Sequence, residues 1–196
     1  QKTYNGAGNL PQGSATLAGA EFTVDYYATL DYKSYDDLKN ADVKPMRSWT
    51  FSTDSNGFCS FDIAHFVSGD AFWYRLDGTP ALPRGTVVIR ETKAPMGYVK
   101  SDEVSFQKIQ ENNSVEGVIT YNAPEVAEQV CRSDIEFTKK SDNGSDRLAG
   151  VPFKVTSLTT GESHIAVTDE NGYFSSASSW NAHDPNTNAN DWALTA

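Results

Sequence analysis

The chain has 196 residues, enough for one large domain or two of ordinary size, and its aromatic and turn-forming residues are typical of a globular protein. The formal net charge of −10 argues against a nucleic-acid partner, because an acidic surface repels the phosphate backbone. Without an apolar run of 18 residues or an N-terminal signal pattern, the sequence predicts neither a membrane span nor a membrane partner, and it fits a piece of a longer chain.

The predicted elements are short strands separated by turn residues, and no stretch shows a long apolar period of 3.6 residues. The insertion after the first strand contains a short predicted helix at residues 35–41. Such closely spaced strands are typical of an all-β sandwich. We predict strands at residues 21–27, 48–53, 57–63, 86–91, 103–110, 116–122, 134–139, 151–158, 163–168 and 172–175.

An internal repeat decides the predicted domain count. Leu-Ala-Gly-Ala-Glu-Phe-Thr-Val at residues 17–24 returns as Leu-Ala-Gly-Val-Pro-Phe-Lys-Val at residues 148–155. In the same order, Thr-Asp-Ser-Asn-Gly-Phe at residues 53–58 returns as Thr-Asp-Glu-Asn-Gly-Tyr at residues 168–173. In both copies the Thr-Asp-x-Asn-Gly motif predicts a hairpin turn, because Asn and Gly tolerate positive φ. The sequence therefore predicts two homologous domains.

The predicted boundaries follow from the repeat. The first domain spans residues 1–123 and carries an insertion near residues 27–47; residues 124–133 lack periodicity and read as a linker. Residues 134–196 match only the N-terminal part of such a domain. The second sandwich is therefore predicted to be C-terminally incomplete, completed either by the rest of a longer protein or by a neighbour.

The strand at residues 86–91 carries one carboxylate in an unusual place. Val87, Ile89 and Glu91 alternate along it and therefore point to one face, which Val87 and Ile89 would turn toward a core. A carboxylate on that face is costly unless it stays protonated or finds a partner. The alternative is that the strand ends here and Glu91 lies at the rim in water.

Metal and cysteine chemistry receive little support. Cys59 and Cys131 show no metal-ligand spacing, and both a disulfide between the domains and two unpaired thiols are consistent with the sequence. No nucleophile arrangement, phosphate-binding loop or cofactor motif is present. Four residues that could be drawn together as metal ligands match no ligand motif and read as surface loop: His164, His183, Asp184 and Asp191.

The insertion and the segment after residue 65 are rich in aromatic side chains. Exposed tyrosines favour contacts with other proteins, because they offer a large area at low entropic cost. The alternative is that these side chains pack locally over the sandwich. The candidates for a binding loop are Tyr27, Tyr32, Tyr35 and Trp73.

These motifs together resemble one family. Leu-Ala-Gly-Ala-x-Phe, Thr-Asp-x-Asn-Gly-Phe and the run Glu-Thr-Lys-Ala-Pro-Met-Gly-Tyr at residues 91–98 resemble the CnaB/SpaA-type repeat domains of Gram-positive surface adhesins and pilins. The resemblance implies a prealbumin-like, Ig-like β-sandwich at the bacterial cell wall. It also implies a Lys–Asn isopeptide bond that the domain makes itself, under the control of a buried acid.

Carried over residue by residue, the resemblance assigns a role to each partner in that bond. The acid that shuttles protons is Glu91, the asparagine is Asn122 and the first-strand lysine is Lys2. In the second domain Lys139 is the corresponding lysine, alternating with Ile135 and Phe137. A lysine in apolar surroundings loses its proton and becomes a nucleophile toward the asparagine carbonyl.

The reaction runs once, so the expected protein is not an enzyme and needs no cofactor. By analogy with a disulfide that closes a loop of similar length, the bond would stabilise the domain by roughly 4–5 kcal/mol. The expected function is a structural stalk of a cell-wall-anchored adhesin or pilin-like protein, with neighbouring repeats of the same chain as partners. The alternative is a module whose aromatic loops bind a host extracellular protein, such as a matrix or immunoglobulin component.

Overall fold

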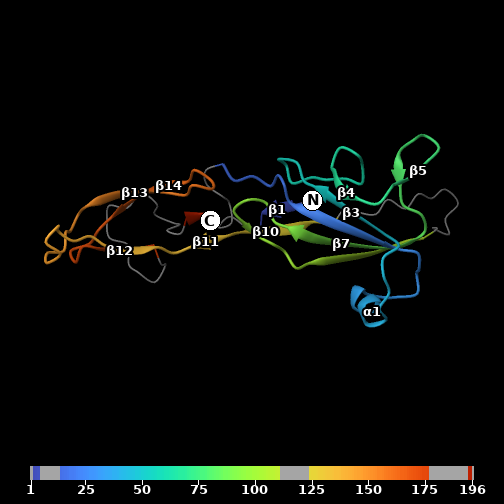
Figure 1. The fold of residues 1–196 in the computed structure, drawn as a ribbon, viewed down its shortest axis with the longest axis horizontal. Helices are drawn as coiled ribbons and strands as arrows, with labels where there is room; N and C mark the ends of the chain where they lie inside the picture. Colours follow the sequence, from blue (N-terminus) through green and yellow to red (C-terminus); the bar gives the residue numbers. More distant parts are fainter. Residues whose placement is uncertain (1, 5–13, 111–123, 177–193, 196) are drawn as a thin grey trace. The chain divides into compact units, whose positions relative to one another are not determined.

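The structure, a computed structural model, describes residues 2–4, 14–110, 124–176 and 194–195, and the chain divides into two compact units. The first unit comprises Gln1–Tyr4 and Thr16–Glu128, and the second comprises Asn5–Ala15 and Gln129–Ala196. Strands dominate both units, with one short helix in the first (Figure 1). The predicted all-β class is confirmed.

Two sheets form most of the first unit. The larger has the order β4-β3-β2-β7-β9, with every neighbouring pair antiparallel. The smaller has the order β1-β10-β8, with β1 parallel to β10, and β5 (Trp73–Tyr74) pairs with β6 (Pro80–Ala81). The strands of the two sheets are β2 (Glu21–Tyr27), β3 (Arg47–Ser52), β4 (Phe66–Gly69), β7 (Gly85–Lys93), β9 (Val104–Ile109), β1 (Lys2–Tyr4), β10 (Val126–Val130) and β8 (Tyr98–Val99).

The inner face of the five-stranded sheet carries the main core of this unit. Val24 on β2 lies between Trp49 of β3 and Ile89 of β7, because paired residues in neighbouring strands share a face. The core cluster is formed by Val24, Tyr26, Trp49, Phe51 and Val87. A second cluster joins Ala20 and Phe22 to Val126 of β10, so β10 packs over this same face.

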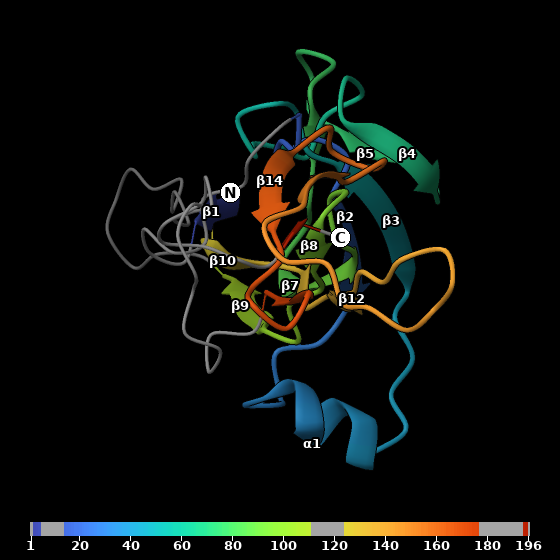
Figure 2. The same ribbon diagram turned by 90° about the vertical axis from the view of Figure 1, so that its left-hand side faces the viewer.

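The outer face of the sheet is covered by the insertion. Ser34 caps α1 (Tyr35–Asn40) by accepting a hydrogen bond from the amide of Asp37, which satisfies one of the free N–H groups at the helix start. Leu38 of α1 is completely buried against Tyr27 and Val88 (α1 lies at the bottom of Figure 2). The insertion therefore supplies a second, smaller core.

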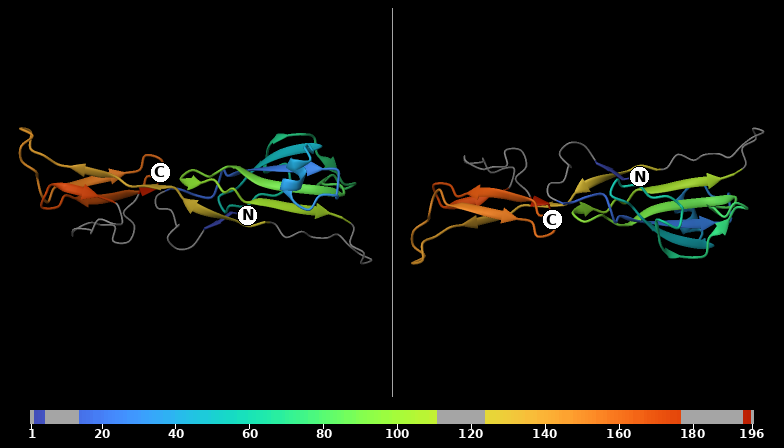
Figure 3. Two further views of the ribbon diagram at one scale, coloured as in Figure 1. Left: turned by 90° about the horizontal axis from the view of Figure 1, so that it is seen from below. Right: turned by 90° about the horizontal axis from the view of Figure 1, so that it is seen from above.

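The second unit consists of paired strands around three aromatic rings (two further views in Figure 3). The ring of Phe137 lies 4.7 Å from Phe153 and 5.3 Å from Phe174, measured between centroids. The antiparallel pairs are β12 (Glu136–Thr138) with β15 (Tyr173–Ser175), β13 (Pro152–Thr156) with β14 (Ser163–Val167), and β11 (Arg132–Ser133) with β16 (Leu194–Thr195).

The repeated motifs make the same hydrogen bonds in both units. The hydroxyl of Thr53 accepts from the amide of Ala20 and donates to the carbonyl of Leu17. Thr168 does the same with Val151 and Leu148. In each following turn the aspartate side chain accepts two backbone amides: Asn56 and Phe58 donate to Asp54, and Asn171 and Tyr173 donate to Asp169. The homology of two domains stays a prediction, and this shared geometry agrees with it.

One predicted strand is missing from the described residues, while the division between the two units falls inside the predicted linker. Residues 57–63 do not form a strand, because Asp62 accepts the amide of His65 and stabilises a local turn in place of a ladder. Residues 124–133, predicted to be a linker, contain β10 and β11, and the first unit passes into the second within β10. The predicted strand at residues 116–122 lies outside the described residues.

Candidate functional site

Glu91 lies near the end of β7 and keeps only 4 % of its surface exposed. Val87 and Ile89, four and two residues before it, pack in the inner core, and Glu91 pairs with Phe22 across the ladder. The structure therefore supports the buried alternative for this carboxyl. Because side chains alternate along a strand, Glu91 lies on the same core face as Val87 and Ile89.

A turn after β7 brings a hydrogen-bond donor back to this carboxyl. Tyr98 donates its amide to the carbonyl of Pro95, and Gly97 between them has a φ of 88°, which favours glycine. The chain then runs back past Glu91, and the amide of Ser101 donates to Oε2 of Glu91 at 2.7 Å. The glycine of the motif is thus needed for a turn that orients the acid.

Glu91 also lines a cavity of about 270 Å³ in the first unit. Its wall includes Phe22 and Ile89 of the large sheet, Val104 and Ser105 of β9, and the segment Pro124–Val126 at the start of β10. The cavity is therefore closed by strands of both sheets. It gives the carboxyl room to act on a group brought in beside it.

The register of β10 brings the first strand of the unit to the same place. Val126, which lines the cavity, is the parallel partner of Lys2 in β1. The first-strand lysine predicted for the cross-link thus lies on the strand next to the one that closes the Glu91 cavity. Of Lys2 the structure describes the backbone only. Asn122 lies outside the described residues, so the predicted set Lys2, Glu91 and Asn122 is only partly placed.

The candidate lysine of the second unit follows β12. Ile135, Phe137 and Lys139 are each half-buried, while Glu136 and Thr138 between them are exposed, as their alternation predicts. The amide of Lys139 donates to the carbonyl of Gly172. Its role as a nucleophile stays a prediction.

The aromatic candidates for a binding loop pack against the first unit. Tyr27 is buried, and Tyr32 and Tyr35 are half-buried against the same small core. Trp73 packs edge-on against Tyr26 and Trp49, and the guanidinium of Arg47 lies 3.8 Å from the centre of the Trp73 ring. The structure therefore favours the alternative of local packing for these four side chains.

Cys59 and Cys131 are free, half-buried thiols, and burial raises the pKa of Cys59. Among the described residues no group of three or more histidine, cysteine or acidic side chains could hold a metal ion. His164, predicted to lie in a surface loop, is on β14 with 14 % of its side chain exposed, because it alternates into the hairpin interior. His183, Asp184 and Asp191 lie outside the described residues.

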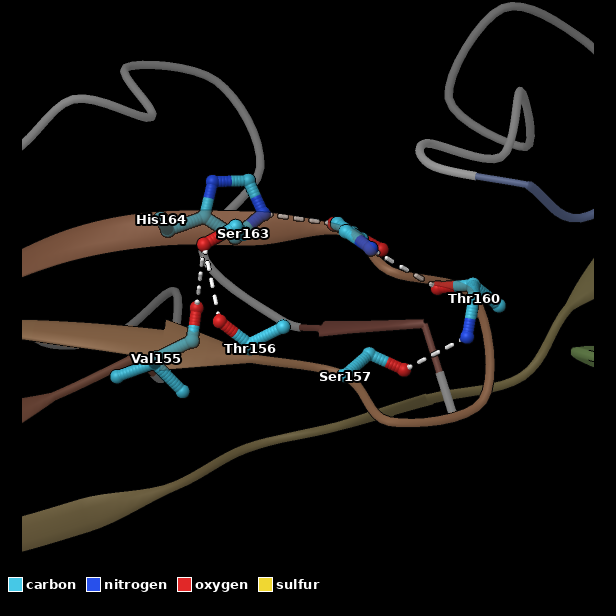
Figure 4. A network of polar contacts seen from close by, with 7 residues as sticks. Val155, Thr156, Ser157, Thr160, Ser163 and His164 are labelled. Carbon is cyan, nitrogen blue, oxygen red and sulfur yellow. Dashed lines mark hydrogen bonds and ion pairs between the residues drawn. The ribbon is translucent and has the colours of Figure 1, made fainter.

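Sequence reasoning missed a buried glutamate, Glu162, at the tip of the β13–β14 hairpin. Its side chain is fully buried, and its Oε1 lies 2.7 Å from Nε2 of His164. The amides of Thr160 and Glu162 bond to the hydroxyls of Ser157 and Thr160, and these contacts form the polar network of Figure 4. The sequence offers one signal for this pair: a Glu directly after the turn glycine Gly161 and two residues before a His.

Comparison with known proteins places this fold in a family. The family SpaA, a prealbumin-like fold domain, matches residues 11–123, and the chain belongs to it. Among solved structures, the Bacillus anthracis TIE protein matches with a TM-score of 0.50 and 20 % sequence identity. That match covers 89 % of this chain, which spans 24 % of the other chain. No curated protein matches.

The family match fits a repeat of a surface or pilin-like protein, and the solved structure agrees with it in fold. The family match covers the large sheet, the insertion and Glu91, while Lys2 and the start of β10, which also belong to the candidate site, lie outside the matched residues. No helix within the described ranges is long and apolar enough to span a membrane.

Proposed function

We propose that this chain is a stalk region of a Gram-positive, cell-wall-anchored adhesin or pilin-like protein, stabilised by an isopeptide bond that its first unit makes itself. The observation that carries the proposal is the position of Glu91. It is a buried carboxyl at a cavity closed by β10, the strand that pairs with β1 and is in register with Lys2.

The proposed reaction joins the side chains of Lys2 and Asn122. A lysine amine in apolar surroundings becomes neutral, and the proposed step is the attack of such an amine on the side-chain carbonyl carbon of the asparagine. The carboxyl of Glu91 polarises that carbonyl and transfers protons from the amine to the leaving amide nitrogen. One C–N bond forms, one C–N bond breaks and one ammonia leaves. Because the product is permanent, the unit is its own substrate and performs no turnover.

The deciding experiment is peptide mapping of the intact chain by mass spectrometry. Digestion should yield one species in which the peptide with Lys2 is joined to the peptide with Asn122, lighter by one ammonia than their sum. The intact mass alone does not decide, because asparagine followed by glycine also loses ammonia when it cyclises, as at residues 5, 56, 143 and 171. An N-terminal glutamine, such as Gln1 in this sequence, also loses ammonia when it cyclises.

The acid is tested with Glu91→Gln, which keeps the shape of the side chain but cannot shuttle a proton. The joined peptide should disappear, with a loss of roughly 4–5 kcal/mol in the free energy of unfolding. Glu91→Ala should lose the bond as well and lower the melting temperature by many degrees. Glu103→Gln is the matched control, because Glu103 lines the same cavity but is exposed, and it should leave the bond intact.

Separate peptides in the unaltered chain would rule out the bond. A joined peptide in Glu91→Gln would rule out Glu91 as the acid, and a joined peptide with another lysine would replace Lys2. The host-binding alternative receives no specific support, because the aromatic side chains that motivated it pack locally.

A further inference from the structure

The loop of residues 141–146 in the second unit carries an asparagine directly before a glycine on an open turn. A bridge between Lys140 and Arg147 closes the base of this loop. Asn143 and Gly144 are both exposed, and a Cβ atom at Gly144 would lie in open space. The turn therefore faces solvent, and its backbone can change conformation at little cost.

Two donors of the loop converge on the side-chain carbonyl of Asn143. Its Oδ1 accepts the backbone amide of Ser145 at 2.9 Å and also the hydroxyl of Ser141. Hydrogen bonds from such donors polarise a carbonyl and stabilise the negative charge that develops on its oxygen when a nucleophile attacks the carbon. The loop itself therefore activates the Cγ atom of Asn143.

The amide nitrogen of Gly144 is the nucleophile that the sequence places next to this carbon. Its attack is intramolecular, so no second molecule has to be bound and oriented. Glycine favours the ring closure because it has no Cβ atom that would hinder it. In the folded loop the amide of Gly144 donates to the carbonyl of Ser141, so the turn must open briefly before the nitrogen can react. An exposed loop allows this opening without unfolding the unit.

The repeated turns provide two matched sites in the same chain. Asn56 precedes Gly57 and Asn171 precedes Gly172, and in each pair the asparagine is exposed while the glycine is buried. A Cβ atom at Gly172 would lie 2.7 Å from the carbonyl oxygen of Lys139, so this turn is packed against other backbone. In the part of the chain that the structure describes, no donor reaches the side-chain oxygen of either asparagine. Both pairs thus share the dipeptide of the loop without its activated carbonyl or its exposed glycine.

We propose that Asn143 is a site of selective, spontaneous modification to aspartate and isoaspartate, while Asn56 and Asn171 react far more slowly. The amide nitrogen of Gly144 bonds to Cγ of Asn143. The proton of that amide passes through water to the side-chain nitrogen, which leaves as ammonia. Water then opens the resulting cyclic imide at either of its two carbonyls. The whole reaction consumes one water, releases one ammonia and needs no enzyme or cofactor.

The modification changes the loop in two ways. Each conversion adds one negative charge to a chain whose formal net charge is −10, and isoaspartate also adds one methylene group to the backbone. The site does not depend on the proposed isopeptide bond, because Lys2, Glu91 and Asn122 belong to the first unit and Asn143 to the second. Failure of either proposal therefore leaves the other standing.

The test is peptide mapping by mass spectrometry of the full chain after incubation at mildly alkaline pH. The peptide with Asn143 should gain its aspartate and isoaspartate forms about tenfold faster than the peptides with Asn56 and Asn171. The same chain in concentrated urea is the control. Once the chain is unfolded, the three pairs lose their structural differences, so the three rates should approach one another. The pair at residues 5 and 6 lies outside the described residues and takes no part in the comparison.

Three variants test the site directly. Ser141→Ala removes the hydroxyl that donates to Asn143 and should slow its conversion severalfold in the folded chain but not in urea. Ser55→Ala is the matched control, because Ser55 is an exposed serine beside Asn56, and it should leave all three rates unchanged. Asn143→Gln should remove the acidic forms of the folded chain seen by ion-exchange chromatography, because the longer side chain closes a larger ring much more slowly.

Several results would overturn the proposal. Asn56 or Asn171 reacting as fast as Asn143 in the folded chain would show that the loop confers no selectivity. A difference between the sites that is no greater in the folded chain than in urea would mean that the fold has no part in it. An unchanged or faster conversion of Asn143 in the Ser141→Ala chain would exclude activation by this hydroxyl.

Discussion

At the scale of single residues, buried polar groups in this protein are held by backbone groups that come from distant parts of the chain. Glu91 accepts the amide of Ser101, and the hydroxyl of Thr53 links the backbone of Leu17 and Ala20. Each of these contacts satisfies a group that would be costly to leave unpaired in a core. Substitutions that remove only the polar atom therefore measure what the contact contributes.

Thr53→Val and Thr168→Val should each lower the free energy of unfolding of their own unit by about 1–3 kcal/mol. The valine keeps the shape of the side chain but leaves a backbone amide without its acceptor. Urea unfolding measures the loss, with Thr23→Val on the surface of β2 as a control within about 0.5 kcal/mol. If one of the two valine substitutions lowers the free energy of unfolding no more than the control does, the two motifs are not energetically equivalent.

Tyr27 predicts a dependence of stability on alkaline pH. Its pKa is raised to about 12 in the folded chain, first by burial and then by Asp25, against about 10 in an unfolded chain. The unfolded chain therefore loses this proton first, and the free energy of unfolding falls as pH rises from about 10 toward 12. Below pH 10 the group has no such effect.

Tyr27→Phe removes this titration and isolates it from other groups that ionise in the same range. Urea unfolding between pH 8 and pH 11 should show that the variant loses less stability with rising pH than the unaltered chain. Parallel curves for the two proteins would mean that Tyr27 is not protected in the folded state.

At the scale of elements, β7 serves both faces of the large sheet. Val87, Ile89 and Glu91 lie on its inner face, while Val88 and Arg90 lie on its outer face against the insertion. A shift of one residue in its register would exchange these sets and place the guanidinium in the apolar core. This strand therefore determines the positions of both Glu91 and Arg90.

The helix α1 is an element whose contribution can be tested separately. Leu38 is its fully buried residue, and Leu38→Ala should cost about 2–5 kcal/mol through lost contacts and the cavity left behind. Leu76 is fully exposed in the same unit, so Leu76→Ala should change little. Thermal melting monitored by circular dichroism gives both values, and equal melting points would mean that the insertion does not seal the outer face.

At the scale of the whole molecule, the proposed cross-link ties the first and last parts of one unit. Single-molecule pulling on the chain should then release no length between Lys2 and Asn122. Glu91→Gln, which lacks the bond, should release about 400 Å more when this unit unfolds, because each extended residue spans about 3.3–3.6 Å. Equal extension of the two proteins would contradict a stalk that carries load through a covalent bond.

How much was predictable follows from the range of the interactions involved. Alternation and turn residues act over a few neighbours, so the sequence alone predicts the all-β class, the repeat, the helix near residue 35 and the strand face that Glu91 shares with Val87 and Ile89. The strand predicted at residues 57–63 is wrong because Asp62 and His65 form a local hydrogen bond that competes with the ladder.

Tertiary structure alone decided which distant groups meet. The amide of Ser101 beside Glu91, the register of Lys2 with Val126, the cavity around Arg90 and the burial of Glu162 all depend on segments far apart in sequence or on how a hairpin is covered. Local sequence patterns carry no information about these contacts. The sequence by itself predicted that Glu91 shares a strand face with Val87 and Ile89. Only the packing of β10 and the return of the chain at Ser101 decided that this carboxyl is buried and what it faces.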